Sequence, residues 1–143
     1  MRTLLLLTIL GEGLYAAHDE SKSCSNATIK GAYGYMATGT SPSGGPGGPL
    51  EQAMGVGVRH YDGHGAFTQV DSRKGSISGT VVDQPASGTY TVNPDCTGVM
   101  FLSAVGQPFP AELRFVVVNK GKEIRWILLT PPGPMIVGNA VRQ

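Results

Sequence analysis

Side chains that could bind a metal ion lie close together in one short segment, at His60, Asp62 and His64. On a regular strand, alternate residues share one face, and two imidazoles with a carboxylate can bind zinc. Asp62 and Gly63, however, form a pair that is typical of a tight turn, which would direct the three side chains apart. We therefore expect ordinary turn histidines here, with no metal site and no cofactor.

The two cysteines, Cys24 and Cys96, are the next candidates for chemistry. Cys96 lies in the turn-like sequence NPDCTG, and no neighbouring base marks it as a nucleophile. An even number of cysteines in an exported chain indicates a disulfide, which for a loop this long contributes about 4 kcal/mol. We predict a Cys24–Cys96 bond between the N-terminal segment and a distant hairpin. The alternative is two buried thiols.

The first twenty residues, MRTLLLLTILGEGLYAAHDE, resemble a signal peptide. Arg2 is a positive start, residues 4–10 are an apolar run too short to span a bilayer, and Ala16 and Ala17 suit a cleavage site. We expect a signal peptide over 1–17 and an N-terminal arm over 18–27. The protein is then expected to be secreted or periplasmic.

Composition and charge exclude some classes of partner. The 143 residues include 21 Gly and 10 Pro, and the formal net charge is +1 without a cluster of Lys or Arg. Nucleic acids and anionic membrane surfaces attract basic patches, so we expect neither as a partner. No segment after the first is long and apolar enough to be a membrane span. Nothing in the sequence indicates an oligomeric state.

The elements that would position a site are short strands. Nine β-rich runs follow one another at 28–38, 53–62, 66–74, 76–83, 88–93, 98–104, 111–119, 122–130 and 135–141. Short sequential turns favour a single antiparallel up-and-down barrel of about eight strands over 28–143, and a β-sandwich is the alternative. The Gly/Pro-rich segment 39–50 is expected to be a flexible loop, either a lid over one barrel end or an insertion without a role.

The hairpin 111–130 has one apolar face. If Lys120 and Gly121 form a two-residue turn, three apolar pairs lie opposite one another: Phe115 with Trp126, Leu113 with Leu128, and Val117 with Ile124. We expect this face to point inward. The other face carries the exposed pairs Glu112 with Arg114 and Glu123 with Arg125, which we interpret as a solvated surface rather than a catalytic set.

Large side chains on these strands are the candidates for a ligand site. In a small barrel they either fill the core or line a cavity for one small guest. The candidate ligand-binding residues are Tyr33, Tyr35, Phe101, Leu113, Phe115, Trp126 and Leu128.

Four segments, CSNATIKGAYGYMATG, YDGHGAFT, GTYTVNPDCTG and VGNAVRQ, resemble those of small exported bacterial proteins. These are calycin-like barrels related to the allene oxide cyclase fold, and the resemblance covers most of the chain from Cys24 onward. It implies a barrel, and relatives with this fold bind apolar small molecules while a few are cyclases. No cyclase catalytic motif matches, so the catalytic residues stay unknown.

Three functions follow as hypotheses. The first is an exported, lipocalin-like barrel that binds a small, mainly apolar molecule. The second is a cyclase or isomerase that uses the barrel cavity, and the third is a structural or interaction module of the cell surface. An empty interior favours the first two, and a filled interior favours the third.

Overall fold

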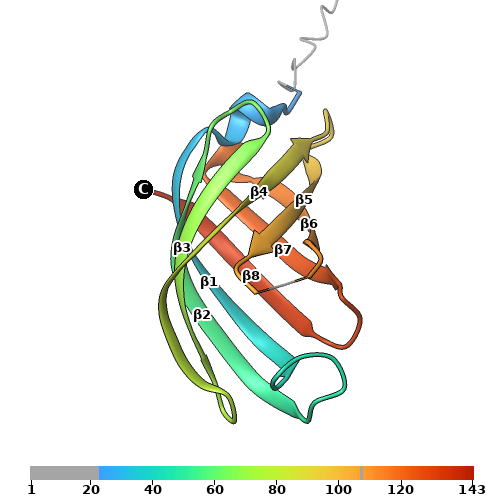
Figure 1. The fold of residues 1–143 in the computed structure, drawn as a ribbon. Helices are drawn as coiled ribbons and strands as arrows, with labels where there is room; N and C mark the ends of the chain where they lie inside the picture. Colours follow the sequence, from blue (N-terminus) through green and yellow to red (C-terminus); the bar gives the residue numbers. More distant parts are fainter. Residues whose placement is uncertain (1–22, 107) are drawn as a thin grey trace, which may run out of the picture.

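The structure, a computed structural model, describes residues 23–106 and 108–143. Within them, eight antiparallel strands form one closed up-and-down barrel (Figure 1). This confirms the predicted all-β barrel and excludes the sandwich. The strands are β1 (Gly31–Pro42), β2 (Leu50–Tyr61), β3 (Ala66–Gly75), β4 (Gly79–Val92), β5 (Thr97–Ala104), β6 (Ala111–Val118), β7 (Glu123–Thr130) and β8 (Met135–Arg142), with the 3₁₀ turns η1 (Asn26–Ile29) and η2 (Asn119–Gly121).

Two of the nine predicted runs belong to one strand. Most of the segments 76–83 and 88–93, namely residues 79–83 and 88–92, lies on β4, which continues through Pro85 and Gly88. Pro85 pairs with Val70, and the register shifts beside it between Asp71 and Arg73. The apparent turn sequence is therefore a strand irregularity, which accommodates a proline without ending the pairing.

The predicted flexible loop is also shorter than 39–50. Residues 39–42 pair with 50–53, which leaves 43–49 as the loop between β1 and β2. The expectation of a flexible loop over the whole of 39–50 was wrong at its start, because Gly39 has a place inside the sheet. A Cβ there would lie 1.9 Å from the backbone oxygen of Met135 on β8, so only glycine allows this approach.

The hairpin of β6 and β7 has the predicted register. Phe115 lies opposite Trp126, and the pairs Leu113 with Leu128 and Val117 with Ile124 also form. Both outer ion pairs are present: Arg114 contacts Glu112 and Arg125 contacts Glu123, each at 2.9 Å. Because these pairs are on the outer surface, the opposite face points into the barrel, as expected for a sheet with one solvated face.

Four aromatic rings on the inner face lie over glycines of the neighbouring strand. In each case the glycine is the direct cross-strand partner, and a Cβ on it would come within 3 Å of the ring. The pairs are Tyr35 with Gly57, Phe67 with Gly88, Phe115 with Gly98, and Trp126 with Gly138. The high glycine content thus has a structural reason, since bulky rings fit inside a narrow barrel where the partner has no side chain.

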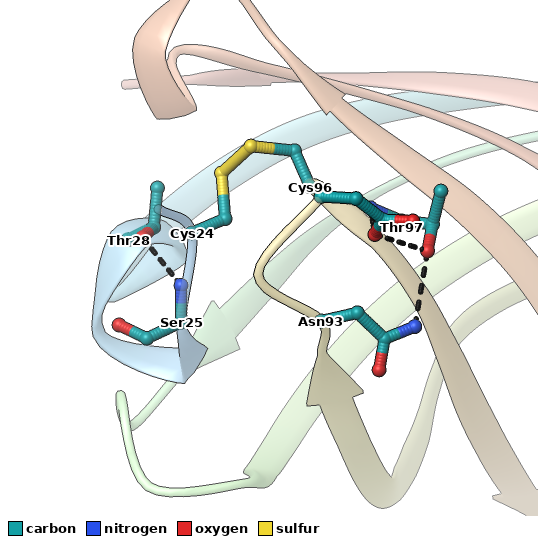
Figure 2. Close-up of a disulfide and its surroundings, with 7 residues drawn as sticks. Cys24, Ser25, Thr28, Asn93, Cys96 and Thr97 are labelled. Atoms are coloured by element: carbon teal, nitrogen blue, oxygen red, sulfur yellow. Dashed lines mark hydrogen bonds between the residues drawn. A yellow bond between two sulfur atoms is a disulfide. The ribbon is translucent and has the colours of Figure 1, made fainter. Parts of the chain in front are cut away.

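One end of the barrel is closed by the N-terminal segment, which lies across it together with the β2–β3, β4–β5 and β6–β7 connections (Figure 1). The predicted disulfide is confirmed: Cys24 and Cys96 are bonded with their Cα atoms 4.9 Å apart (Figure 2). Asn26 Oδ1 accepts a hydrogen bond from Val92 N at 2.8 Å. Tyr90 Oη accepts one from Gly63 N at 3.0 Å and donates to Asn26 O at 3.2 Å. The N-terminal segment is therefore attached both covalently and by partly buried hydrogen bonds, and it plugs this end of the barrel.

The expected signal peptide and residues 18–22 of the expected arm lie outside the described residues. In the part of the chain that is described, no helix has the length and apolar character to cross a membrane.

Candidate ligand cavity in the open half of the barrel

Inward-facing side chains become smaller from the closed end to the open end. On β1, Tyr33 and Tyr35 are followed by Ala37, and on β2, Tyr61 and Arg59 are followed by glycines and then Ala53. The closed half is filled: Tyr61 packs edge-on against Tyr33 and Tyr90, with ring centroids 5.4 and 5.0 Å apart. Since alanine and glycine replace these rings further along, the open half is not filled.

A cavity of about 240 Å³ lies in that open half. Its walls are mostly aliphatic and include Ala37, Leu102, Leu113, Trp126, Leu128 and Ile136. Pro131 and Pro134, in the β7–β8 connection, border its mouth. This volume equals that of about eight water molecules at about 30 Å³ each, so one small guest can enter.

Arg59 lies at the inner end of this cavity. Its side chain is 1% exposed although it carries a full charge. Nε donates to Gln69 Oε1 at 2.8 Å, and Nη1 contacts Tyr61 Oη at 3.3 Å and Met100 Sδ at 2.9 Å. The guanidinium also lies 4.9 and 5.0 Å from the ring centroids of Tyr35 and Phe67. These neutral contacts hold the group in a fixed orientation at the boundary between the two halves.

A chain of hydrogen bonds leads from Arg59 to Asp71, an acid that lines the cavity. Gln69 Nε2 donates to Tyr35 Oη at 3.0 Å, and Tyr35 Oη donates to Asp71 Oδ2 at 3.0 Å. Burial raises the pKa of Tyr35 well above its ordinary value, and the negative charge of Asp71 raises it further. Tyr35 therefore stays protonated and acts as a hydrogen-bond donor to Asp71.

The predicted ligand-binding residues divide into three groups. Tyr35, Leu113, Trp126 and Leu128 line the cavity. Tyr33 and Phe115 are buried in the filled half, and neither borders the cavity. Phe101 was wrongly assigned, since it lies on the outer face of β5 and is 41% exposed. Phe101 and its neighbour Leu102 lie on opposite faces of the strand. Because the surrounding sequence is apolar on both faces, it does not show which of the two faces inward.

Arg59, Gln69 and Asp71 were not among the residues singled out from the sequence. The alternation of residues along each strand could have identified them. In GVGVRHY, Arg59 shares a face with Tyr61 and two glycines. On the next strand, Gln69 and Asp71 share a face with Phe67. A charged residue on the predicted inner face is the pattern that marks a polar site in a small barrel.

The segment with His60, Asp62 and His64 forms the β2–β3 turn. Asp62 Oδ1 accepts hydrogen bonds from the backbone N–H groups of His64, Gly65 and Ala66, at 2.7, 2.9 and 3.0 Å. These bonds lower the pKa of Asp62. Asp62 is thus a turn-capping residue, and across the described residues no cluster of metal-ligating side chains was found.

A second hollow, of about 570 Å³, lies on the outer surface over β1, β6, β7 and β8. It includes Met36, Val116, Ile127 and Val137, together with the exposed Arg114 and Arg125. Its size therefore reflects a concave part of the barrel surface rather than an enclosed site.

Comparisons with protein-family models, with curated proteins and with solved structures found no match to this chain.

Proposed function

We propose that the protein is an exported barrel that binds one small, mainly apolar molecule in the cavity of its open half. The observation that carries the proposal is a cavity with aliphatic walls in a barrel whose other end is plugged. Small-molecule sites are commonly concave, largely apolar and provided with few polar groups, which this cavity matches.

Export is part of the same proposal. The Cys24–Cys96 disulfide is of the kind that forms in oxidising compartments, and the leader-like sequence before it agrees with secretion. The resemblance to calycin-like, allene-oxide-cyclase-like bacterial barrels supports binding rather than any one reaction. N-terminal sequencing of the secreted protein tests export, with a start between His18 and Cys24 expected and a start at Met1 contradicting it.

Binding is tested by titrating the protein with 1-decanol, an apolar probe, while Trp126 emission is recorded. Trp126 is the only tryptophan and lines the cavity, so a saturable change is expected. Ala37→Phe, which fills the cavity, should weaken binding at least tenfold. Met36→Phe is the matched control, since Met36 is the adjacent residue, is exposed and lies outside. Equal loss in both variants, or no saturable response, would contradict the proposal.

The second candidate is a cyclase or isomerase, and the Asp71–Tyr35 pair favours it. A carboxylate with a hydrogen-bonded phenol at a cavity wall can accept and return a proton. If this function holds, a bound molecule is converted, and Asp71→Asn stops conversion while the molecule still binds. Recovery of every bound molecule unchanged would reject it and leave the binding function standing.

A further inference from the structure

We propose that the ligand is an amphipathic monocarboxylate, with its carboxylate bound by Arg59 and its apolar chain directed along the cavity to the open end. This inference rests on the proposed binding function and specifies the class of ligand. Its basis is the buried charge of Arg59, the direction of the cavity from it, and the apolar residues around the mouth.

Arg59 carries a buried positive charge. No carboxylate among the described residues lies within 4.0 Å of the guanidinium, and the hydrogen-bond partners of Arg59 are all neutral. A buried charge without an ion pair is unfavourable unless another group compensates it. A negatively charged guest in the adjoining cavity would compensate it.

Arg59 also has hydrogen-bond donors to spare. Within the described residues, Nη2 of Arg59 has no hydrogen bond, while Nε and Nη1 are engaged. Trp126, which also lines the cavity, has its Nε1 buried without a partner. Both groups are donors that lack an acceptor. Nη2 of Arg59, which unlike Trp126 Nε1 is not fully buried, can donate to an acceptor in the cavity, and a planar guanidinium suits a carboxylate particularly well.

The charged side chains of the lining favour a particular number of negative charges on the guest. Asp71 also lines the cavity, separated from Arg59 by Gln69 and Tyr35. Arg73 lines the cavity as well, so Arg59, Arg73 and Asp71 together give the lining a net formal charge of +1, which a guest with one negative charge neutralises and a guest with two does not. A single carboxylate is thus favoured over a phosphate monoester of the same chain length.

The cavity walls set the direction of the apolar chain. From Arg59 toward the mouth, the wall consists of aliphatic side chains such as Leu113, Leu128 and Ile136. Several apolar side chains in and beside the connections at this end of the barrel are exposed: Leu50, Ile77, Val105, Phe109 and Met135. If each carbon takes about the volume of a water molecule, a chain of about eight carbon atoms fills the cavity, and a longer chain would extend past its mouth.

The test compares decanoate with 1-decanol on the wild-type protein, at neutral pH and below the micelle concentration of each. We expect decanoate to bind at least tenfold more tightly, because a hydrogen bond to a charged group contributes about tenfold to a hundredfold in affinity. Decyl phosphate should bind less tightly than decanoate. Shortening the carboxylate should weaken binding about fourfold per methylene removed.

Variants then assign the effect to Arg59. Arg59→Met should remove the preference for decanoate while 1-decanol binds as before, and Arg59→Lys should restore part of it. Arg125→Met is the matched control, because Arg125 is an exposed arginine on the outer surface and should leave both affinities unchanged. Asp71→Asn removes the repelling charge and should tighten decanoate binding several-fold.

The outcomes separate the inference from the proposed function. If 1-decanol binds as tightly as decanoate in the wild type, the carboxylate inference is wrong and the apolar binding function stands. That comparison needs no variant, so it holds even where Arg59→Met fails to fold. Tighter binding of decyl phosphate would replace the carboxylate with a phosphate, and absence of binding by all three probes would reject both proposals.

Discussion

The closed and open halves of the barrel use the same strands but different side chains. Toward the closed end, the inner positions carry Tyr33, Tyr61 and Tyr90, and the interior is filled. Toward the open end, the same strands carry alanine and glycine, and a cavity remains. The difference shows that the size of the inward residues, and not the barrel topology, decides where a ligand could enter.

The largest expected effect concerns the closed end. Replacing both Cys24 and Cys96 by Ser removes a bond that spans 72 residues, which should lower stability by about 4 kcal/mol and the melting temperature by on the order of 15 °C. Calorimetry measures this loss. Because the bond lies at the opposite end from the cavity, the affinity of the folded variant for decanoate should not change. A loss of affinity would show that the two halves are coupled.

The contrast between the halves can be measured on one strand. Met100 is fully buried in the filled half, and Leu102, two residues along the same face of β5, lines the cavity. Met100→Ala should cost about 3 kcal/mol, because it leaves a new void in packed surroundings. Leu102→Ala should cost about 1 kcal/mol, because its side chain is half-buried and already borders space. Equal losses in urea unfolding would mean that the open half is packed like the closed half.

Acid should destabilise the turns at both ends. Hydrogen bonds from Ser78 and Ile77 lower the pKa of Glu51, those from His64 and its neighbours lower that of Asp62, and those from Thr97 lower that of Asp95. Their folded pKa values lie below the unfolded ones, so this stabilisation is complete above about pH 5 and is lost as the pH falls below about 4.

Thermal unfolding between about pH 6 and 3 checks this expectation. The melting temperature should fall as the pH falls, and the melting temperature of Asp62→Asn should fall less steeply than that of the wild type. An unchanged slope in Asp62→Asn would mean that Asp62 contributes nothing to the acid sensitivity.

The smallest expected effect is on the outer surface. Glu123→Gln breaks the exposed pair with Arg125, and such pairs contribute about 0–1 kcal/mol. Chemical denaturation should detect a change below about 1 kcal/mol, and ligand affinity should stay the same. A larger loss would show that the outer pairs support the barrel wall.

Residue types and their alternation along the strands were enough to predict much of the fold. The register of Phe115 opposite Trp126 and the Cys24–Cys96 bond both follow from residue types that have few alternatives. Pro85 and Gly39 misled the assignment, because proline and glycine mark turns in most sequences but lie inside strands here. Their places depend on contacts with neighbouring strands, which local sequence does not contain.

The site was less predictable than the fold. Large aromatic residues pointed to the interior, yet Tyr33 and Phe115 belong to the filled half. Arg59 was overlooked because its burial depends on Gln69, Tyr35 and Phe67 from other strands. Whether an inward position lines a void or a core depends on residues far away in sequence, and no short motif encodes it.

The central claim is that a ligand binds in the open half of the barrel and not in the filled half. Its most direct test is a methyl-resolved NMR titration with decanoate that records contacts between ligand and protein. The account predicts nuclear Overhauser effects from the decanoate chain to the methyl groups of Leu113, Leu128 and Ile136, with none to Val92, Val117 or Ile124 in the filled half. Contacts instead with Val116, Ile127 and Val137 would place the ligand in the outer hollow and contradict it.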